Sequence, residues 1–371
     1  MVRLARCETL DPSEVSVAHV FTRVVRRCFL LGDDPVSGKN FDHRKVWIEQ
    51  YLQHFSACFG VDLLAFSILS NHFHLILRSR PDVVATWCDQ EVARRWLLLC
   101  PHRRNPDGSP AQPSEPEINS IAGCPVKCAE IRSRLSDISW WMRLLCQRVA
   151  MRANRDDGET GRFFQDRYKA VKLVDEASLL ACAAYVDLNP IRAAIAQTLE
   201  TSDHTSVQHR IEAMVRERES TESHASAPER EGSEVRTKPP VDPLHRRDDF
   251  LAPLTIHEAT GAVGPCVSGT GKRASNKGFL PMSLTDYLQL LDWTARQVRP
   301  GKTGSTGRDV PAVIQRLGLE PTAWTELVSE FGKLFHCVAG HPDNVDRLRS
   351  QRTQRRFHLR RRVRELMPSS D

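Results

Sequence analysis

Two apolar runs separated by a polar turn place the strongest constraint on how this chain folds. The segment LLAFSILSNHFHLILRSRPD, residues 63–82, predicts two strands joined at a Ser-Asn turn. Side chains alternate across a strand, so His72 and His74 project from one face while Phe73 points into the opposite layer. Two imidazoles on one face are half of a divalent-metal site. Two polar residues on the wet face of a sheet are the alternative interpretation.

A second segment, GRFFQDRYKAVKLVDEASLLACAAYVDLNPIRAAI, predicts a strand followed by a helix over residues 161–195. Tyr185 and Asn189 are four residues apart in that helix, so a phenol and a carboxamide share one helical face. Pro190 kinks or ends the helix next to Asn189. An ordinary core or boundary tyrosine is the alternative interpretation of Tyr185.

Together the two segments resemble a known family. SNHFHLIL resembles the HUH motif of single-tyrosine transposases, and GRFFQDRYKAVKLVDEASLLACAAYVDLNPIRA resembles the tyrosine-helix region of the insertion-sequence-200-like transposases. The nearer branch is the REP-associated tyrosine transposases, which often carry Tyr-x-x-x-Asn-Pro-(Val/Ile)-(Arg/Lys), matched here by residues 185–192. The resemblance covers roughly residues 15–200. An insertion around residues 99–128 and a long C-terminal extension depart from the short family members.

The resemblance implies a set of roles for single residues. His72 and His74 match the metal ligands, Tyr185 matches the nucleophile, and Asn189 matches the polar residue that completes the metal shell. It also implies Mg²⁺ or Mn²⁺, single-stranded or hairpin DNA as substrate, a 5'-phosphotyrosine link and a free 3'-hydroxyl. The other tyrosines of the chain, none of which has an asparagine four residues on, are Tyr51, Tyr168 and Tyr287.

The order of predicted elements gives the fold class. A strand at 16–26, a helix at 41–59, the two strands of 63–82, helices at 81–99 and 129–154, and the strand and helix of 161–195 follow one another. This order is typical of an α+β, ferredoxin-like antiparallel sheet with helices on one face. The open face of that sheet is expected to carry the histidines, with the Tyr185 helix packed nearby.

The domain organisation is predicted from shifts in composition. Residues 1–201 form the transposase-like domain, and the charged stretch 202–250 is expected to be a flexible linker whose first part, 207–218, can continue as a helix. Residues 251–340 recover apolar periodicity and predict a small helical region, with helices at 283–298 and 321–335. Residues 341–371 form an arginine-rich tail.

Nine arginines fall within residues 347–364, where a solvated basic tail without a partner is the alternative to a nucleic-acid clamp. The arginines predicted to contact nucleic acid are Arg352, Arg355, Arg356, Arg360, Arg361 and Arg362. In the insertion, Cys100, His102, Cys124 and Cys128 are a candidate zinc set, although their spacing matches no strong zinc pattern and a flexible loop is expected between them.

Composition limits which kinds of partner and which cell compartment agree with the sequence. A net charge of +6 permits a polyanion partner, and no apolar run approaches the length of a membrane span. Eleven cysteines without framework spacing favour reduced thiols, and the first residues lack the apolar core of a signal peptide, so a cytoplasmic monomer or homodimer is expected.

Three functions agree with these observations. The first is a metal-dependent DNA strand-transferase or nickase that acts through Tyr185. The second is a domesticated nucleic-acid-binding protein that keeps the fold without transposition. The third is a metal-dependent hydrolase that uses His-x-His and water. Retention of His72, His74, Tyr185 and Asn189 together favours the first.

Overall fold

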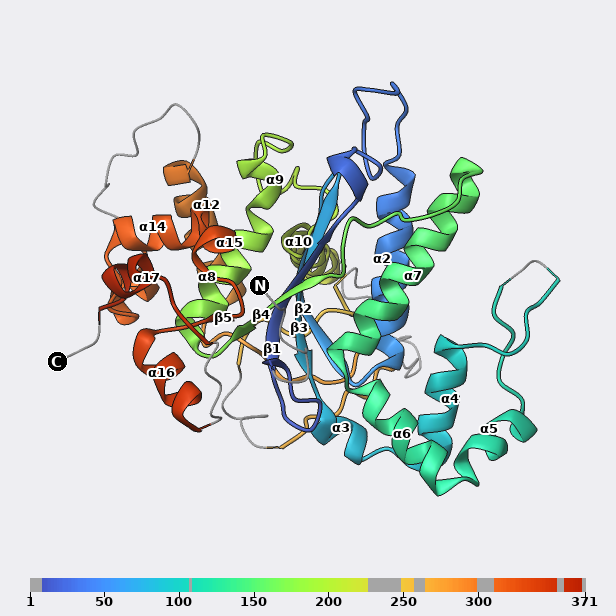
Figure 1. The fold of residues 1–371 in the computed structure, drawn as a ribbon. Coiled ribbons are helices and arrows are strands. Elements are labelled where there is room, and N and C mark those ends of the chain that lie inside the picture. The colour runs from blue at the N-terminus through green and yellow to red at the C-terminus, as the bar shows by residue number, and fades with distance from the viewer. Residues whose placement is uncertain are drawn as a thin grey trace, which may run out of the picture.

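The computed structural model describes residues 9–106, 109–225, 248–256, 264–298, 310–351 and 357–368. Within these ranges the centre is a five-stranded sheet in the order β2-β3-β1-β4-β5 (Figure 1). β1 pairs antiparallel with β3 and with β4, β2 pairs antiparallel with β3, and β5 runs parallel to β4. The predicted α+β class is therefore confirmed, and β1 to β4 are antiparallel as expected, but β5 makes the sheet mixed. The strands are β1 Val17–Arg23, β2 Val61–Ile68, β3 His72–Ser79, β4 Lys169–Leu173 and β5 Val338–Ala339.

Helices from the first half of the chain share one hydrophobic core with the face of the sheet that carries Phe73 and Val20. Phe55 on α2 and Trp141 on α7 meet at the middle of this core, with ring centroids 5.4 Å apart at 89°. Such edge-to-face pairs add to the free energy of burial. The elements on this side are η1 Val25–Arg27, α2 His43–Cys58, α3 Pro81–Ala85, α4 Asp89–Leu99, α5 Glu115–Ala122, α6 Pro125–Leu135 and α7 Ile138–Asp157.

The insertion contributes structure of its own, whereas the sequence predicted a flexible loop. Ser114 and Glu117 form a reciprocal capping box that begins α5, with the Ser114 backbone N–H donating to Glu117 at 2.8 Å. Arg103 donates to the same carboxylate at 2.9 Å. A segment that looks polar in sequence is thus ordered by a cap and an ion pair, which composition alone does not reveal.

The second face of the sheet is also covered, which corrects the expectation of helices on one face only. α8 packs against β2 and β3, and residues beyond 201 join it in a second core that includes Trp324 and Phe331. Figure 1 shows these helices opposite α2 and α7. The helices on this side are α8 Glu176–Asp187, α9 Asn189–Arg192, α10 Ser206–Ala225, α12 Leu284–Val298, α13 Ala312–Arg316, α14 Pro321–Ser329 and α15 Phe331–Leu334.

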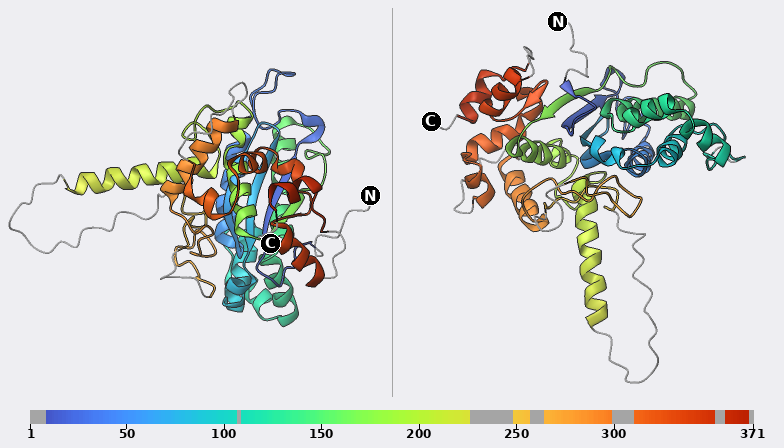
Figure 2. Two further views of the ribbon diagram at one scale, coloured as in Figure 1. Left: turned by 90° about the vertical axis from the view of Figure 1, so that its left-hand side faces the viewer. Right: turned by 90° about the horizontal axis from the view of Figure 1, so that it is seen from below.

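The predicted linker 202–250 begins as a packed helix. Val207 is fully buried, and the Ser206 hydroxyl donates to Asp187 at 2.6 Å. His204 and His209 both contact the carboxylate of Glu49 on α2. The far half of α10 leaves the body of the protein (Figure 2). The helix that the sequence allowed over 207–218 is thus present, and the segment is packed up to Ala213 instead of forming a flexible linker from residue 202. Residues 226–247 lie outside the described residues.

The predicted arginine-rich tail is also folded where the structure describes it. α16 Pro342–Gln351 and α17 Arg361–Leu366 flank β5 and the second core. Val345, Phe357 and Val363 are each 1% exposed or less. The basic segment is therefore an amphipathic part of the fold rather than a solvated tail, because buried apolar residues alternate with its arginines.

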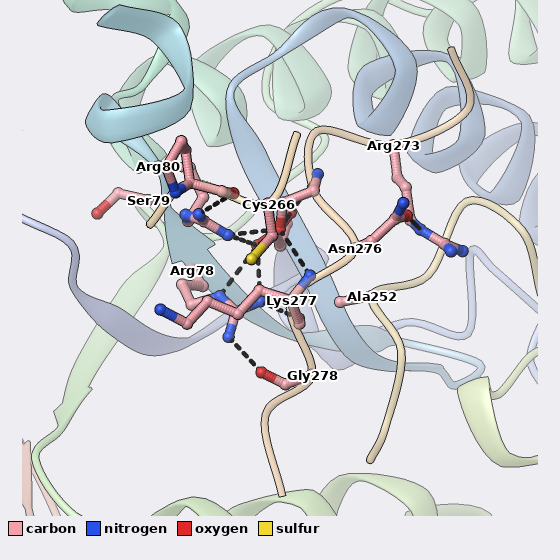
Figure 3. A network of polar contacts seen from close by, with 12 residues as sticks. Arg78, Ser79, Arg80, Ala252, Cys266, Arg273, Asn276, Lys277 and Gly278 are labelled. Atoms are coloured by element: carbon pink, nitrogen blue, oxygen red, sulfur yellow. Dashed lines mark hydrogen bonds and ion pairs between the residues drawn. The ribbon is translucent and has the colours of Figure 1, made fainter. Parts of the chain in front are cut away.

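A buried ionic network fastens the segment around residues 265–278 to the end of the sheet. Asp62 is 1% exposed and accepts hydrogen bonds from Arg78 at 2.8 Å, from Arg80 at 3.1 Å and from the Ser275 hydroxyl. Arg78 also donates to the carbonyl of Gly278 at 2.9 Å, as Figure 3 shows. Two buried guanidinium groups thus share the carboxylate of Asp62.

Replacing Asp62 with alanine is expected to destabilise the protein by about 3–5 kcal/mol, because the buried Arg78 loses the carboxylate it pairs with and Arg80 loses one of its two. The free energy of unfolding in urea measures the effect. Asp82→Ala is the matched control, since Asp82 also pairs with Arg80 at 2.8 Å but its side chain is 34% exposed. We expect a loss of about 1 kcal/mol or less there. Equal losses in the two variants would contradict the dependence on Asp62.

None of the helices in the described part of the chain combines the length and apolar character that a membrane span requires.

Candidate active site

The histidine pair lies where the alternation of β3 predicts. His72 and His74 are opposite Arg23 and Phe21 of β1, and Phe73 points into the opposite core. Phe73 is 0% exposed and meets Phe164 at a centroid distance of 6.0 Å. The alternation is confirmed, but the expected solvated face is not, because His74 is only 3% exposed beneath α8 and the C-terminal region.

Tyr185 comes to the same place from α8. Its ring centroid lies 5.4 Å from that of His74, at an interplanar angle of 87°. His72 and His74 are themselves 4.9 Å apart by ring centroid. A cavity of about 400 Å³ is lined by all three side chains. Residues more than a hundred positions apart in sequence are thus brought together by the packing of α8 on β3.

Asn189 lies just beyond the end of α8. α8 ends at Asp187 and a short helix begins at Asn189, so the predicted interruption next to Pro190 is present, and Leu188 between the two helices keeps a helical conformation. Asn189 is 8% exposed, does not line the cavity, and its Nδ2 has no hydrogen-bond partner among the described residues. Arg192 lines the cavity instead, with its guanidinium carbon 4.9 Å from the Tyr185 ring centroid. A metal-binding role for Asn189 stays a prediction.

His19 belongs to the site, and sequence reasoning missed it. It lies on β1, is 1% exposed, and its Nε2 is 2.9 Å from Nδ1 of His74. Its ring meets the edge of Tyr185 at 5.8 Å. The available signal was a lone histidine inside the apolar strand VAHVF, which does not by itself reveal a neighbour on a distant strand.

Burial sets the protonation states. It lowers the pKa of His19 to about 3, and burial together with the charge of Arg23 lowers the pKa of His72 to about 4. Burial also lowers the pKa of His74 well below its usual value. The three imidazoles are therefore neutral at pH 7 and keep the lone pairs that metal ligation needs. Burial raises the pKa of Tyr185, and Arg192 partly opposes that shift.

The donor atoms of the pair suit a divalent ion. His72 Nδ1 lies 2.6 Å from Asn71 Oδ1, which accepts only, so the proton is on Nδ1 and Nε2 carries the lone pair. His74 Nε2 is buried and has no hydrogen-bond partner among the described residues. Within the same residues no three His, Cys, Asp or Glu side chains converge as a complete ligand set. His72 and His74 could therefore bind an ion whose remaining ligands are not His, Cys, Asp or Glu side chains of the described residues.

The zinc candidates of the insertion do not converge either. Cys124 is exposed, and the buried Cys128 thiol donates to Asp89 at 3.1 Å. No group containing these side chains forms a metal cluster in the described part of the chain.

The C-terminal region covers the tyrosine. Phe331 on α15 stacks on the Tyr185 ring at 5.6 Å and 29°. A Cβ atom built on Gly332 would stand 3.1 Å from the Tyr185 hydroxyl oxygen. Arg192 donates to the carbonyl of Ser329, which fastens this cover to the helix that follows Tyr185. The region whose role the sequence left open therefore forms one wall of the cavity.

The cavity carries more positive than negative groups. Its lining includes two acidic residues, Asp166 and Glu330. The basic residues of the lining come from four separate parts of the chain and are Arg23, Arg167, Lys169, Arg192 and Lys333. Five cations against two anions favour a phosphate-bearing ligand.

The arginines predicted to contact nucleic acid have other partners where they are described. Arg360 donates to His336 at 2.6 Å, and Arg361 donates to Glu365 at 3.0 Å. Arg362 pairs with Glu326. Arg352, Arg355 and Arg356 lie outside the described residues. None of Arg360, Arg361 and Arg362 lines the cavity.

Comparison with known proteins adds little to this geometry. No protein-family model matches the chain, and no curated protein matches it. Among solved structures, the chain is similar to a REP-associated tyrosine transposase bound to a REP hairpin. The alignment has 10% sequence identity, covers 52% of this chain and 76% of the other, and gives a TM-score of 0.27. A likeness of that degree carries no weight for fold or function, so both rest on the residues described above.

Proposed function

We propose that this protein is a metal-dependent DNA nickase or strand-transferase that forms a 5'-phosphotyrosine link through Tyr185. One observation carries the proposal: the Tyr185 ring lies 5.4 Å from His74 in a cavity that His72 also lines. The resemblance of the SNHFHLIL and Tyr-x-x-x-Asn-Pro segments to HUH transposases supports it independently. Single-stranded or hairpin DNA is the proposed substrate, with Mg²⁺ or Mn²⁺ as cofactor.

His72 and His74 would hold the ion through Nε2, and Asn189 remains a candidate for completing its shell. When bound, a divalent ion polarises the scissile phosphate and orients it for in-line displacement. The cations of the cavity wall, chiefly Arg23 and Lys169, would neutralise neighbouring phosphates, and Lys333, which pairs with Glu330 at 2.6 Å, would have to exchange that partner.

Tyr185 supplies the nucleophilic oxygen. In the proposed step the bond from Tyr185 Oη to phosphorus forms as the bond from phosphorus to the 3' oxygen breaks. The phenol loses its proton and the 3' oxygen gains one, so no oxidant or further reactant is needed. Burial raises the pKa of Tyr185, and the charge of Arg192 opposes this, which makes Arg192 the group in this chain best placed to favour the phenolate.

A DNA-binding protein without chemistry is the second candidate, and one observation favours it. Phe331 and Gly332 close over the Tyr185 ring and hydroxyl, so a phosphate has little room at the oxygen in this arrangement. The experiment that separates the two candidates is incubation with end-labelled hairpin DNA and Mn²⁺, followed by denaturing electrophoresis. A labelled band at the mass of the protein plus a DNA fragment supports the enzyme. Retarded migration on native gels without that band supports the binding protein.

Gly332→Ala is expected to slow adduct formation by roughly tenfold to a hundredfold, because a methyl group 3.1 Å from the Tyr185 hydroxyl displaces the reacting oxygen. The initial rate of adduct formation measures the effect. Gly269→Ala is the matched control, since nothing lies within 4 Å of a Cβ built there. An unchanged rate in Gly332→Ala would mean that α15 moves away from Tyr185 before reaction.

A further inference from the structure

We propose that His19 is a positioning residue whose Nε2 accepts the Nδ1–H of His74 and thereby presents the His74 Nε2 lone pair to the metal. The inference rests on the proposed function, because it assigns His74 as a metal ligand. Its basis is the contact of 2.9 Å between His19 Nε2 and His74 Nδ1, made by two residues that are 1% and 3% exposed.

The contact has two possible arrangements, since either ring can donate the shared proton. If His19 donates, His74 carries its proton on Nε2 and cannot bind a metal there. If His74 donates, its Nε2 is unprotonated and has a free lone pair. The other ring nitrogens, His19 Nδ1 and His74 Nε2, have no hydrogen-bond partner among the described residues. Hydrogen bonds among the described residues therefore satisfy neither arrangement fully. A metal could take the free lone pair of His74 Nε2 only in the second arrangement, because in the first that nitrogen carries a proton.

The two histidines of the pair reach the same tautomer by different partners. His72 Nδ1 donates to Asn71 Oδ1 at 2.6 Å, so its neighbour in sequence fixes its proton. His74 has no such neighbour, and His19 on the adjacent strand takes that place. Metal-ligating histidines commonly donate their second ring N–H to an acceptor that fixes the tautomer and the ring orientation.

His19 is not itself placed as a ligand. It does not line the cavity, and aromatic edges surround its ring, with Tyr185 at 5.8 Å and Phe331 at 5.9 Å. Its ring is nearly parallel to that of His74, at 14° and 5.1 Å. His19 would therefore affect an ion bound by His72 and His74 only indirectly, by fixing the tautomer of His74.

Calorimetric titration of the full-length protein with Mn²⁺, in the absence of DNA, tests the inference. His19→Phe keeps a flat ring without an acceptor and should weaken Mn²⁺ binding about 10- to 100-fold. His19→Gln keeps a carbonyl acceptor and should recover part of the affinity. His43→Gln is the control, because His43 starts α2 on the opposite face of the sheet. The expected order of affinity is wild type and His43→Gln, then His19→Gln, then His19→Phe.

Nitrogen-15 NMR of histidine-labelled wild-type protein without metal gives a second measurement, and it needs no variant of His19. The His74 signal, assigned by its loss in His74→Gln, should show the proton on Nδ1. A proton on Nε2 would overturn the inference, and so would equal Mn²⁺ affinity in wild type and His19→Phe. If the wild-type protein binds no Mn²⁺ while His74 still shows the Nδ1 proton, the metal assignment in the proposed function fails instead.

Discussion

Tyr185→Phe should form no covalent adduct with DNA, while binding hairpin DNA with unchanged affinity. The substitution removes the only atom of this side chain that can attack phosphorus. The ring contacts with Phe331 at 5.6 Å, with His74 at 5.4 Å and with Arg192 remain possible for phenylalanine. Adduct yield on denaturing gels and affinity on native gels, measured on one preparation, give the two values to compare.

Tyr168→Phe is the matched control for this result. The Tyr168 hydroxyl donates to Ser139 at 3.0 Å in the opposite core, so its loss removes a tyrosine oxygen without touching the cavity. Tyr287 is not accessible to DNA, because it is 1% exposed and donates to the buried carboxylate of Asp187 at 2.7 Å. A DNA-modified peptide containing Tyr51, Tyr168 or Tyr287 in mass spectrometry would transfer the role and remove the basis of the proposal.

The result also separates the three candidate functions. A hydrolase that activates water would continue to cut DNA when Tyr185 becomes phenylalanine. A binding protein would give no cleavage in either form. Only a tyrosine nuclease loses both the adduct and the cleavage while it keeps the affinity for DNA.

The sequence predicted those parts of the site that depend on local periodicity. A period of two puts His72 and His74 on one face whatever the strand pairs with, and the structure confirms that alternation. The order of elements places the Tyr185 helix near the open face of the sheet that carries the histidines. The structure shows the result of that packing, with the Tyr185 ring 5.4 Å from the His74 ring.

Contacts between distant segments were not predictable in the same way. His19 joins His74 only because β1 pairs with β3, and Phe331 reaches Tyr185 through more than a hundred residues of intervening chain. The predicted interruption of the helix next to Pro190 is present, but Asn189 does not line the cavity. A single sequence can indicate where a helix is interrupted. It does not indicate how the side chains after the interruption are oriented.

The arginine cluster shows the same limit for charge. Counting residues indicated a basic tail that contacts nucleic acid, but Arg362 pairs with Glu326 and Arg364 pairs with Asp346, acidic residues of α14 and α16. Deleting residues 341–371 would therefore remove buried Val345, Phe357 and Val363 along with the arginines. Such a deletion cannot separate DNA binding from folding, whereas point variants in the cavity wall can.

His74→Ala should abolish cleavage and Mn²⁺ binding, because the buried Nε2 is one of two imidazole donors available to the ion. His72→Ala should do the same with a smaller effect on stability, since His72 is only partly buried. His74 is 3% exposed, so its truncation is expected to reduce the free energy of unfolding by about 1–3 kcal/mol and still leave the protein folded. Removing divalent ions from the wild-type protein with EDTA should reproduce the loss of cleavage without the loss of stability.

His209→Ala is the control that separates metal binding from general damage. His209 is also buried, contacts Glu49 at 3.3 Å, and has an unpartnered Nδ1 among the described residues, but it does not line the cavity. Its truncation should destabilise the protein to a similar degree and leave Mn²⁺ affinity and cleavage unchanged. If either His72→Ala or His74→Ala cleaves hairpin DNA at the wild-type rate in Mg²⁺, the pair does not hold the catalytic ion. The clustering of three neutral imidazoles beside Tyr185 would then be a feature of packing alone.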